Sequence, residues 1–283
     1  MQDIDNKIAF QVRYQKGYEK ALNLLKEQGF KYVAIAFGDL DYLLEGDFNK
    51  KIALLSTQLK ELNLKCVFTH SPYYDLLISA ENFDEKMDKG QRLSIKATKL
   101  LGADIIAFHP RSYIRNGVVD NEKSLQQNKK DLIRLVEYAN SLGVKIALEN
   151  LCTFSDHEEK FYPQTSCDLI KLVNCFSNVC AVWDFGHAHL NGNDQVKDVL
   201  NLKELLLATH VHSNNLDNDY HLLPFDGTTS WQGIINALKE INYIGYLTLE
   251  VNYDIETITK EFVKKAYDQV SLLYKMLKSK VKD

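Results

Sequence analysis

The 283 residues of this chain are 45% hydrophobic and carry a formal net charge of −4. Such a chain can bury a full core, and no window reaches the roughly 18 uninterrupted apolar residues of a membrane-spanning helix. The N-terminus lacks the charged and apolar regions of an export signal, and the five cysteines form no Cys-x-x-Cys pair. We therefore predict a cytoplasmic protein with reduced thiols and no membrane partner, and its acidic charge gives no argument for nucleic acid.

Apolar runs alternate with amphipathic runs along the whole chain. The predicted strands cover residues 7–12, 32–37, 64–69, 104–108, 144–148, 179–183, 207–211 and 245–249. The predicted helices cover residues 18–27, 52–62, 87–101, 131–142, 167–173, 196–206, 231–241 and 257–277. The strands are apolar throughout their length, as strands covered on both faces are.

This alternation predicts an α/β fold, a single-domain (β/α)₈ TIM barrel over residues 1–283. An open doubly wound sheet is the alternative, but it predicts a Gly-x-Gly-x-x-Gly turn after the first strand, and residues 12–17 contain none. The longest irregular segments, 110–122, 152–165 and 213–230, all follow strands. Barrel enzymes carry their chemistry on that face.

Six consecutive strands end on a residue that binds metals or carries protons. They are His70, His109, Glu149, Asp184, His212 and Glu250. His187 follows three residues after Asp184, and an extended backbone would point Asp219 and His221 to the same side of the loop after the seventh strand. In a closed barrel all nine side chains would line one cup.

Each of these residues alone has a structural explanation, since a single histidine is often a hydrogen-bonded core residue and a single carboxylate often caps a helix. Six in succession are not explained in this way. Four carboxylates and several histidines in one cavity need a neutralising charge, which divalent metal ions supply.

Imidazole and carboxylate ligands without thiolate favour Zn²⁺, Mn²⁺, Co²⁺ or Fe²⁺ over Ca²⁺, and nine ligands are too many for one ion. We predict two or three divalent ions, zinc or manganese, held by these nine residues. Glu149 and Glu250 lie across the barrel from each other and are predicted to bridge ions or to exchange protons with a substrate.

Three other histidines are weaker candidates. His210 precedes His212 by two residues, so it is predicted to point the same way one layer deeper, as a core residue or a partner of the ligands. Only proximity in sequence suggests that His157 or His189 contacts the site.

These motifs resemble those of the xylose-isomerase-like barrel superfamily, which contains sugar and sugar-phosphate isomerases and epimerases together with endonuclease IV, a metal-dependent nuclease acting at abasic sites. The similarity covers essentially the whole chain. His70-Ser71-Pro72-Tyr73 resembles the family's His-x-Pro-Tyr, and Phe108-His109-Pro110 resembles its Phe-His-Pro-Gly, with Arg111 in place of glycine. The other matches are Leu148-Glu149-Asn150, Asp184-x-x-His187, His212-x-x-Asn215 with Asn215 replacing the usual acid, Asp219-x-His221 and Glu250.

The resemblance implies two different functions. All nine positions that hold three zinc ions in the nuclease branch have matching residue types here. In the epimerase branch, the resemblance implies a metal at Glu149, Asp184, His212 and Glu250, with the two glutamates as the proton-transfer pair. Residues 219–227 look more like the isomerase-side loop than the nuclease loop.

We expect a divalent-metal-dependent sugar or sugar-phosphate isomerase or epimerase that moves a proton through an enediolate, with Tyr73 and Arg111 binding the substrate. The alternative is an endonuclease IV-like phosphodiesterase with a multinuclear zinc centre, for which Arg111, Arg115 and Lys160 would supply positive charge. A metal-free binding protein would require the ligand pattern to be a coincidence. The expected partner is a small sugar, with nucleic acid only under the alternative, and the sequence leaves a homo-oligomer open.

Overall fold

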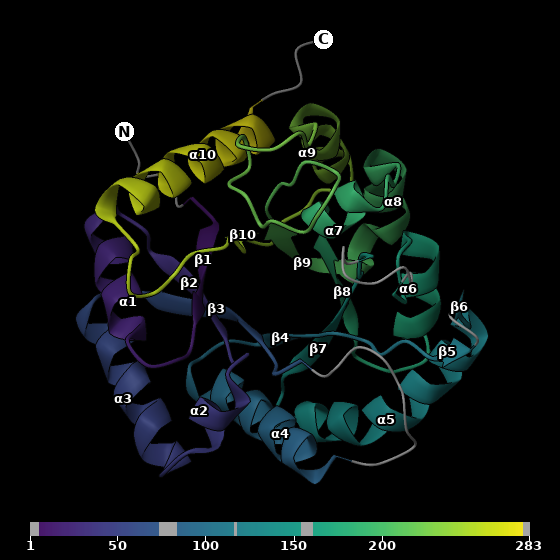
Figure 1. Cartoon of the computed structure of the whole chain (residues 1–283), viewed down its shortest axis with the longest axis horizontal. Helices are drawn as coiled ribbons and strands as arrows, with labels where there is room; N and C mark the ends of the chain where they lie inside the picture. Colours follow the sequence, from purple (N-terminus) through teal and green to yellow (C-terminus); the bar gives the residue numbers. More distant parts are fainter. Residues whose placement is uncertain (1–5, 74–83, 116–117, 154–160, 280–283) are drawn as a thin grey trace.

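The computed structural model describes residues 6–73, 84–115, 118–153 and 161–279. Its central element is a closed barrel of parallel strands (Figure 1). These are β1 (Ile8–Arg13), β2 (Tyr32–Ala36), β3 (Lys65–His70), β4 (Ile105–Phe108), β7 (Lys145–Glu149), β8 (Cys180–Asp184), β9 (Leu206–Val211) and β10 (Leu247–Leu249). The barrel closes where β1 pairs in parallel with β10, so the predicted TIM barrel is confirmed.

Helices surround the barrel, as Figure 1 shows in a view along its axis. They are α1 (Tyr18–Glu27), α3 (Phe48–Glu61), α4 (Glu85–Leu100), α5 (Asn121–Ser141), α6 (Ser166–Val173), α8 (Gln195–Leu202), α9 (Trp231–Glu240) and α10 (Lys260–Lys278). Helix α10 packs against both α9 and α1 and so closes the ring. In the described part of the chain, no helix combines the length and apolar character needed to cross a membrane.

Several boundaries differ from those predicted. Helix α5 begins at Asn121, ten residues before the predicted start at 131, because Asp120 caps it by accepting the N–H of Lys123 at 3.0 Å. Its first turns are polar, so they lack the helical spacing of apolar residues from which a helix is predicted. Segment 110–122 is also not irregular throughout, since it forms a hairpin of β5 (Ile114–Arg115) and β6 (Val118–Val119).

Short elements at the carboxyl ends of the strands were not predicted. Helix α2 (Leu40–Leu44) follows β2, and α7 (Phe185–Leu190) begins directly after β8. The 3₁₀ turn η1 (Lys203–Leu205) separates α8 from β9, so the predicted helix 196–206 ends early. Five or six residues give too little periodicity for a helix to be recognised.

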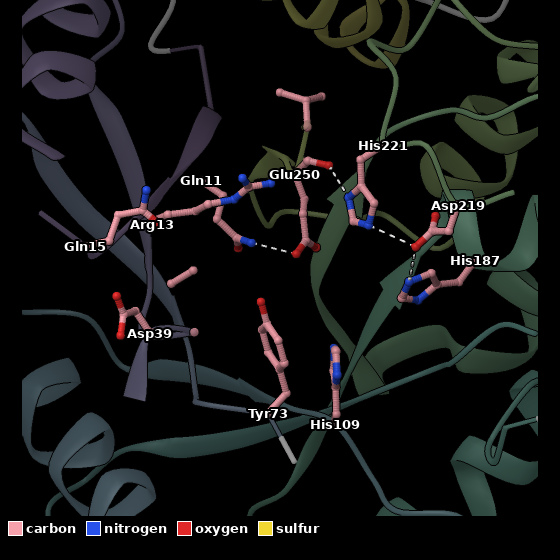
Figure 2. Close-up of a pocket in the computed structure, with 13 residues that line it drawn as sticks. Gln11, Arg13, Gln15, Asp39, Tyr73, His109, His187, Asp219, His221 and Glu250 are labelled. Carbon is pink, nitrogen blue, oxygen red and sulfur yellow. Dashed lines mark hydrogen bonds and ion pairs between the residues drawn. The ribbon is translucent and has the colours of Figure 1, made fainter. Parts of the chain in front are cut away.

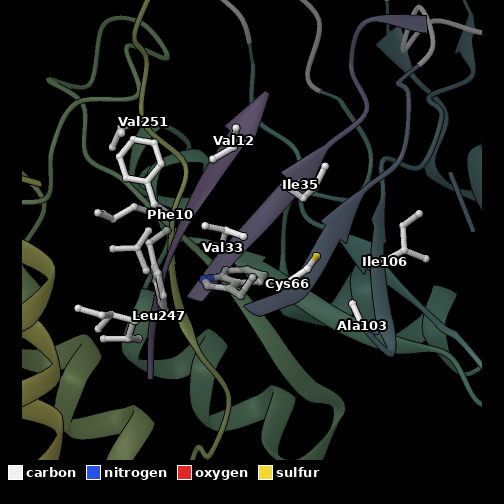
Figure 3. Packing of buried hydrophobic residues seen from close by; sticks show 14 of the residues in the cluster. Phe10, Val12, Val33, Ile35, Cys66, Ala103, Ile106, Leu247 and Val251 are labelled. Carbon is white, nitrogen blue, oxygen red and sulfur yellow. The ribbon is translucent and has the colours of Figure 1, made fainter. Parts of the chain in front are cut away.

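The alternation of side chains along each strand divides the barrel into two environments. On β1, for example, Gln11 and Arg13 line a cavity at the carboxyl end of the barrel (Figure 2). Phe10 and Val12, which alternate with them along the strand, belong to the core between strands and helices (Figure 3). This alternation gives every strand one inward row, and the carboxyl-terminal members of these rows form the site.

Small side chains fill the barrel below that site. The inner cluster is Ala34, Phe68, Ala107, Ala147, Cys180, Val182 and Ala208. The ring of Phe68 lies edge-on to the imidazole of His210, with ring centres 5.5 Å apart. The polar side chains above therefore lie on an apolar layer.

Candidate metal centre

All nine residues predicted as metal ligands lie together at the carboxyl end of the barrel. Figure 2 shows five of them, His109, His187, Asp219, His221 and Glu250, around one cavity. Their donor atoms, together with that of His210, form four groups in which every pair of atoms is within 4.8 Å. One of these groups, His70, His210 and Glu250, shares all its members with the first two of the three groups described below. Glutamate and histidine side chains from opposite walls therefore reach the same small volume.

The first group contains His70, His109 and Glu149. Nε2 of His70 lies 3.2 Å from Nε2 of His109 and 3.2 Å from Oε2 of Glu149. Nε2 of His109 lies 3.3 Å from the same carboxylate oxygen. Three donor atoms thus meet at one point.

The second group contains Glu149, Asp184, His210 and Glu250. Nδ1 of His210 lies 2.9 Å from Oε1 of Glu149 and 2.6 Å from Oε2 of Glu250. It also lies 3.8 Å from Oδ2 of Asp184. His210 was predicted as a core residue or a partner of the ligands, and the structure places it between the two predicted catalytic glutamates. Glu149 contributes one oxygen to each of the first two groups.

The third group contains His187, His212, Asp219 and His221. Oδ2 of Asp219 lies 3.3 Å from Nε2 of His187 and 3.0 Å from Nε2 of His221. The backbone around Asp219 is not extended as predicted, because His221 has φ of +49°; the turn still brings both side chains together. Nε2 of His212 bonds Oδ2 of Asp184 at 2.9 Å, which joins this group to the second.

Local structure explains how β8 delivers two of these residues. Asp184 caps α7 by accepting the N–H of His187 at 2.6 Å, so both side chains lie on one side of the first helical turn. The side-chain amide of Asn150 bonds the N–H and C=O of Asp184, which ties β7 to β8. A Cβ on Gly186 would lie 1.9 Å from the ring of His212, so glycine is required there for close approach.

The protonation pattern of three histidines fits a metal centre. Nδ1 of His70, His187 and His221 each lies 2.8 Å from a main-chain carbonyl oxygen. Those carbonyls belong to Ser71, Asn150 and Glu250. Because a carbonyl only accepts, Nδ1 of each ring carries a hydrogen, which leaves Nε2 as the ring atom that faces the donor group. Metal-binding histidines are oriented in the same way.

Two further buried atoms support this fit. Nδ1 of His212 and Oδ1 of Asp219 have no hydrogen-bond partner among the described residues and lie 3.9 Å apart. Buried polar atoms are rarely left unpaired. The donor set combines imidazoles and carboxylates, which suits a divalent transition metal.

Without an ion, imidazolium groups neutralise the carboxylates. Burial favours the neutral ring of His221, but Asp219 outweighs it and raises the pKa of His221 to about 9. The pKa of His210 is likewise raised well above its usual value, because Glu149 and Glu250 outweigh burial. Although burial opposes the shift, His210 in turn lowers the pKa of Glu250. Binding of a cation here therefore requires release of protons.

The metal-free protein should lose stability as the pH rises from 6.5 to about 9. The pKa of His221 is raised in the fold from 6.5 to about 9, so its stabilising contribution is complete below 6.5 and disappears as the pH rises through 9. The pKa of Asp219 is lowered, so its contribution is present above about pH 4 and is lost only in acid. We expect the urea midpoint of chelator-treated protein to fall across this range and saturating Zn²⁺ to remove the fall. A constant midpoint in the metal-free protein would contradict the pairing.

The other predicted residues lie at different places. Tyr73 lines the cavity, with its ring stacked on His109 at 5.4 Å, whereas Arg111 is directed to α5, where Nη1 lies 3.6 Å from Oδ2 of Asp131. Arg111 as a substrate ligand stays a prediction. His189 bonds the hydroxyl of Thr228 at 2.8 Å. His157 and Lys160 lie outside the described residues.

Two residues of β1 that the sequence interpretation missed also line the cavity. Nε2 of Gln11 donates to Oε1 of Glu250 at 2.7 Å, and Arg13 lies at the mouth. Both belong to the inward row of β1, and that alternation was the signal that could have found them. The cavity has a volume of about 310 Å³, at the small end of ligand pockets.

The model of the xylose isomerase-like TIM barrel family matches residues 22–270, a range that includes all nine donor residues. The chain belongs to this family. The family resemblance drawn from the motifs is thus confirmed. Family membership also accounts for the match between the barrel topology and the positions of the motifs at strand ends.

The similar proteins of known sequence are distant from this chain. An uncharacterized protein of Methanocaldococcus jannaschii is 26% identical over 212 residues, which cover 72% of this chain and 70% of the relative. A 2-oxo-tetronate isomerase of Haemophilus influenzae is 28% identical over 158 residues, which cover 53% of this chain and 58% of the relative.

Solved structures extend the comparison over nearly the whole chain. A D-tagatose 3-epimerase-like protein has a TM-score of 0.75 at 21% identity, covering 95% of this chain and 97% of its own. D-Psicose 3-epimerase, solved in the presence of D-fructose, has a TM-score of 0.75 at 15% identity, covering 96% and 100%. At these identities the likeness shows the fold.

Proposed function

We propose that this protein is a divalent-metal-dependent isomerase or epimerase of a small sugar or sugar derivative. The observation that carries the proposal is the placement of Glu149 and Glu250, which come from separate strands and both contact Nδ1 of His210. Two carboxylates that meet at one histidine, with Glu250 lining the cavity and Glu149 buried behind it, are suited to proton transfer to and from a carbon acid. The names of three similar proteins, a 2-oxo-tetronate isomerase, a 3-epimerase and a 3-epimerase-like protein, support this reaction class.

We infer that two or three divalent ions, zinc or manganese, are held by the three donor groups. A bound ion would stabilise the negative charge that develops on a substrate carbonyl when the neighbouring carbon loses its proton. The chain's own residues supply the rest of the chemistry.

The two glutamates have different surroundings. Glu149 is completely buried, whereas the side chain of Glu250 is 18% exposed and lines the cavity. We therefore assign removal of the proton to Glu250, and we assign delivery of a proton to the carbon to Glu149 in its protonated form, with exchange with solvent restoring both groups after turnover. Gln11 fixes the Glu250 carboxylate through its 2.7 Å bond, and Tyr73 faces Glu250 across the cavity, where its hydroxyl is placed to bond a sugar (Figure 2).

Deuterium exchange tests the proposal directly. Metal-loaded protein is incubated in D₂O with neutral ketoses, ketose phosphates and 2-oxo sugar acids, and the sugars are examined by NMR. We expect deuterium at the carbon next to the carbonyl of at least one substrate. No exchange with any of these substrates, with either zinc or manganese loaded, would refute the proposed function.

A second candidate is a phosphodiesterase that cleaves DNA at abasic sites. The observation favouring it is that three donor groups are present and that Glu149 joins the first two. Against it, Arg13 is the only lysine or arginine among the described residues that line the cavity. Incubation with an abasic-site duplex at low salt separates the two candidates. Strand cleavage without sugar exchange would favour the nuclease.

A further inference from the structure

Arg13 ends β1 and faces the mouth of the cavity. Gln11, two residues earlier on the same strand, bonds Glu250 inside the barrel, and alternation along the strand gives Arg13 the same direction. Both residues line the cavity. In Figure 2 the side chain of Arg13 extends from β1 toward Glu250. The strand therefore places one cation in the lining of the cavity that Glu250 also lines.

The guanidinium of Arg13 is held in place by neutral groups. Nη1 donates to the main-chain oxygen of Tyr253 at 2.9 Å, and Nη2 donates to Oδ1 of Asn252 at 3.0 Å. The guanidinium carbon also lies 5.2 Å from the centre of the Tyr253 ring. A guanidinium has five N–H donors, and these contacts use two of them. No carboxylate of the described residues forms an ion pair with Arg13. Its orientation is fixed while its charge is not neutralised.

Gln11 provides an independent sign of a ligand. Its side chain is only 6% exposed, and its Oε1 accepts no hydrogen bond from the described residues. Because Nε2 is occupied by Glu250, the amide cannot turn to satisfy Oε1 without losing that bond. A buried acceptor is rarely left without a partner, and a hydroxyl group on a molecule bound in the cavity can supply one.

We propose that Arg13 binds an anionic group, a carboxylate or a phosphate, at the end of the substrate remote from the glutamate pair, while Gln11 accepts a hydrogen bond from a hydroxyl between them. This rests on the proposed isomerase function and narrows its substrates to short sugar acids or sugar phosphates. A guanidinium binds both anions through paired, charge-assisted hydrogen bonds. A cavity of about 310 Å³ limits the substrate to a single short sugar.

Binding measurements test this without depending on catalysis. Calorimetric titrations of the zinc-loaded full chain compare two matched pairs, erythronate with erythritol and xylulose 5-phosphate with xylulose. Arg13→Gln should weaken binding of the anionic member by about 10- to 100-fold, as expected for loss of a charged hydrogen-bond partner, and leave the neutral member unchanged. The pair with the larger Arg13-dependent difference identifies the anion as carboxylate or phosphate.

Lys7 offers a matched control at the opposite end of β1. Its Nζ donates to the main-chain oxygen of Ile244 at 2.9 Å and lies 5.7 Å from the centre of the Tyr246 ring. Lys7→Gln therefore removes one charge and similar contacts far from the mouth of the cavity. It should leave the affinity for all four ligands unchanged.

Two results would overturn the inference. If Arg13→Gln lowered the affinity for neutral and anionic ligands equally, Arg13 would only support the loop at residues 252–254. Unchanged anion affinity would mean that the anion binds elsewhere, for example at the zinc. Failure of the proposed function is a separate outcome: Arg13-dependent anion binding without deuterium exchange would refute the isomerase and leave the anion site standing.

Discussion

Glu250→Gln should reduce deuterium incorporation into the substrate by about 10²- to 10⁴-fold, the usual contribution of a general base. The amide keeps the size of the side chain but does not accept the proton. Glu149→Gln should reduce deuterium incorporation by a similar factor, because an amide does not donate the proton that returns to the carbon. NMR-detected exchange in D₂O measures both variants against the wild type.

Loss of metal must be distinguished from loss of the base, because both glutamates belong to the donor groups. Elemental analysis and saturation with Mn²⁺ make that distinction. A fully metal-loaded Glu250→Gln protein with wild-type exchange would contradict its assignment as the base. Glu256→Gln, an exposed position six residues further on, is the control for a change of one charge and should exchange normally.

Gly186→Ala should lower the affinity for metal by at least about 10- to 100-fold, the range found when the surroundings of a ligand are disturbed. The new Cβ would lie 1.9 Å from Cε1 and 2.2 Å from Nδ1 of His212, so the ring must move. His212 holds Oδ2 of Asp184 at 2.9 Å and joins the second donor group to the third, so its displacement affects both. Equilibrium dialysis with Zn²⁺ measures the change.

A matched substitution controls for adding a methyl group to a helical glycine. Gly233 lies in α9, where a Cβ would meet only the end of the Val196 side chain, at 2.9 Å. Gly233→Ala should bind metal like the wild type, with a modest cost in stability of about 1–3 kcal/mol if Val196 cannot adjust. Normal metal binding by Gly186→Ala would show that the ring of His212 is not needed where the structure places it.

The barrel and the convergence of the nine donor residues were predictable because they depend on local periodicity. A buried parallel strand is apolar until it leaves the barrel, so a histidine or carboxylate at its end marks both the boundary and the functional face. His70, His109 and Glu149 illustrate this, since each ends or directly follows a strand and all three meet in one group.

The partition into donor groups was not predictable, because it depends on side-chain rotamers and backbone turns. Asp219 and His221 meet through a turn with φ of +49° at His221, where an extended backbone was expected. His210 contacts both glutamates because its ring crosses the barrel above Phe68, which spacing along β9 does not reveal. Alternation along β1 could have indicated Arg13 as a lining residue, but its neutral partners could not be predicted, because they lie 239 residues or more away in the sequence.

The pairing of β1 with β10, which closes the barrel, affects when the site is complete during folding. Gln11 and Glu250 are 239 residues apart in the chain and bond where β1 meets β10, the first and last strands of the barrel in chain order. Contacts of such separation form late in folding, because a long loop must close before they contribute. A partly folded chain can therefore bring together the donors of the first group before Glu250 joins them. Catalysis as proposed here needs the closed ring, so turnover reports closed barrels, whereas metal binding by the first group does not require closure.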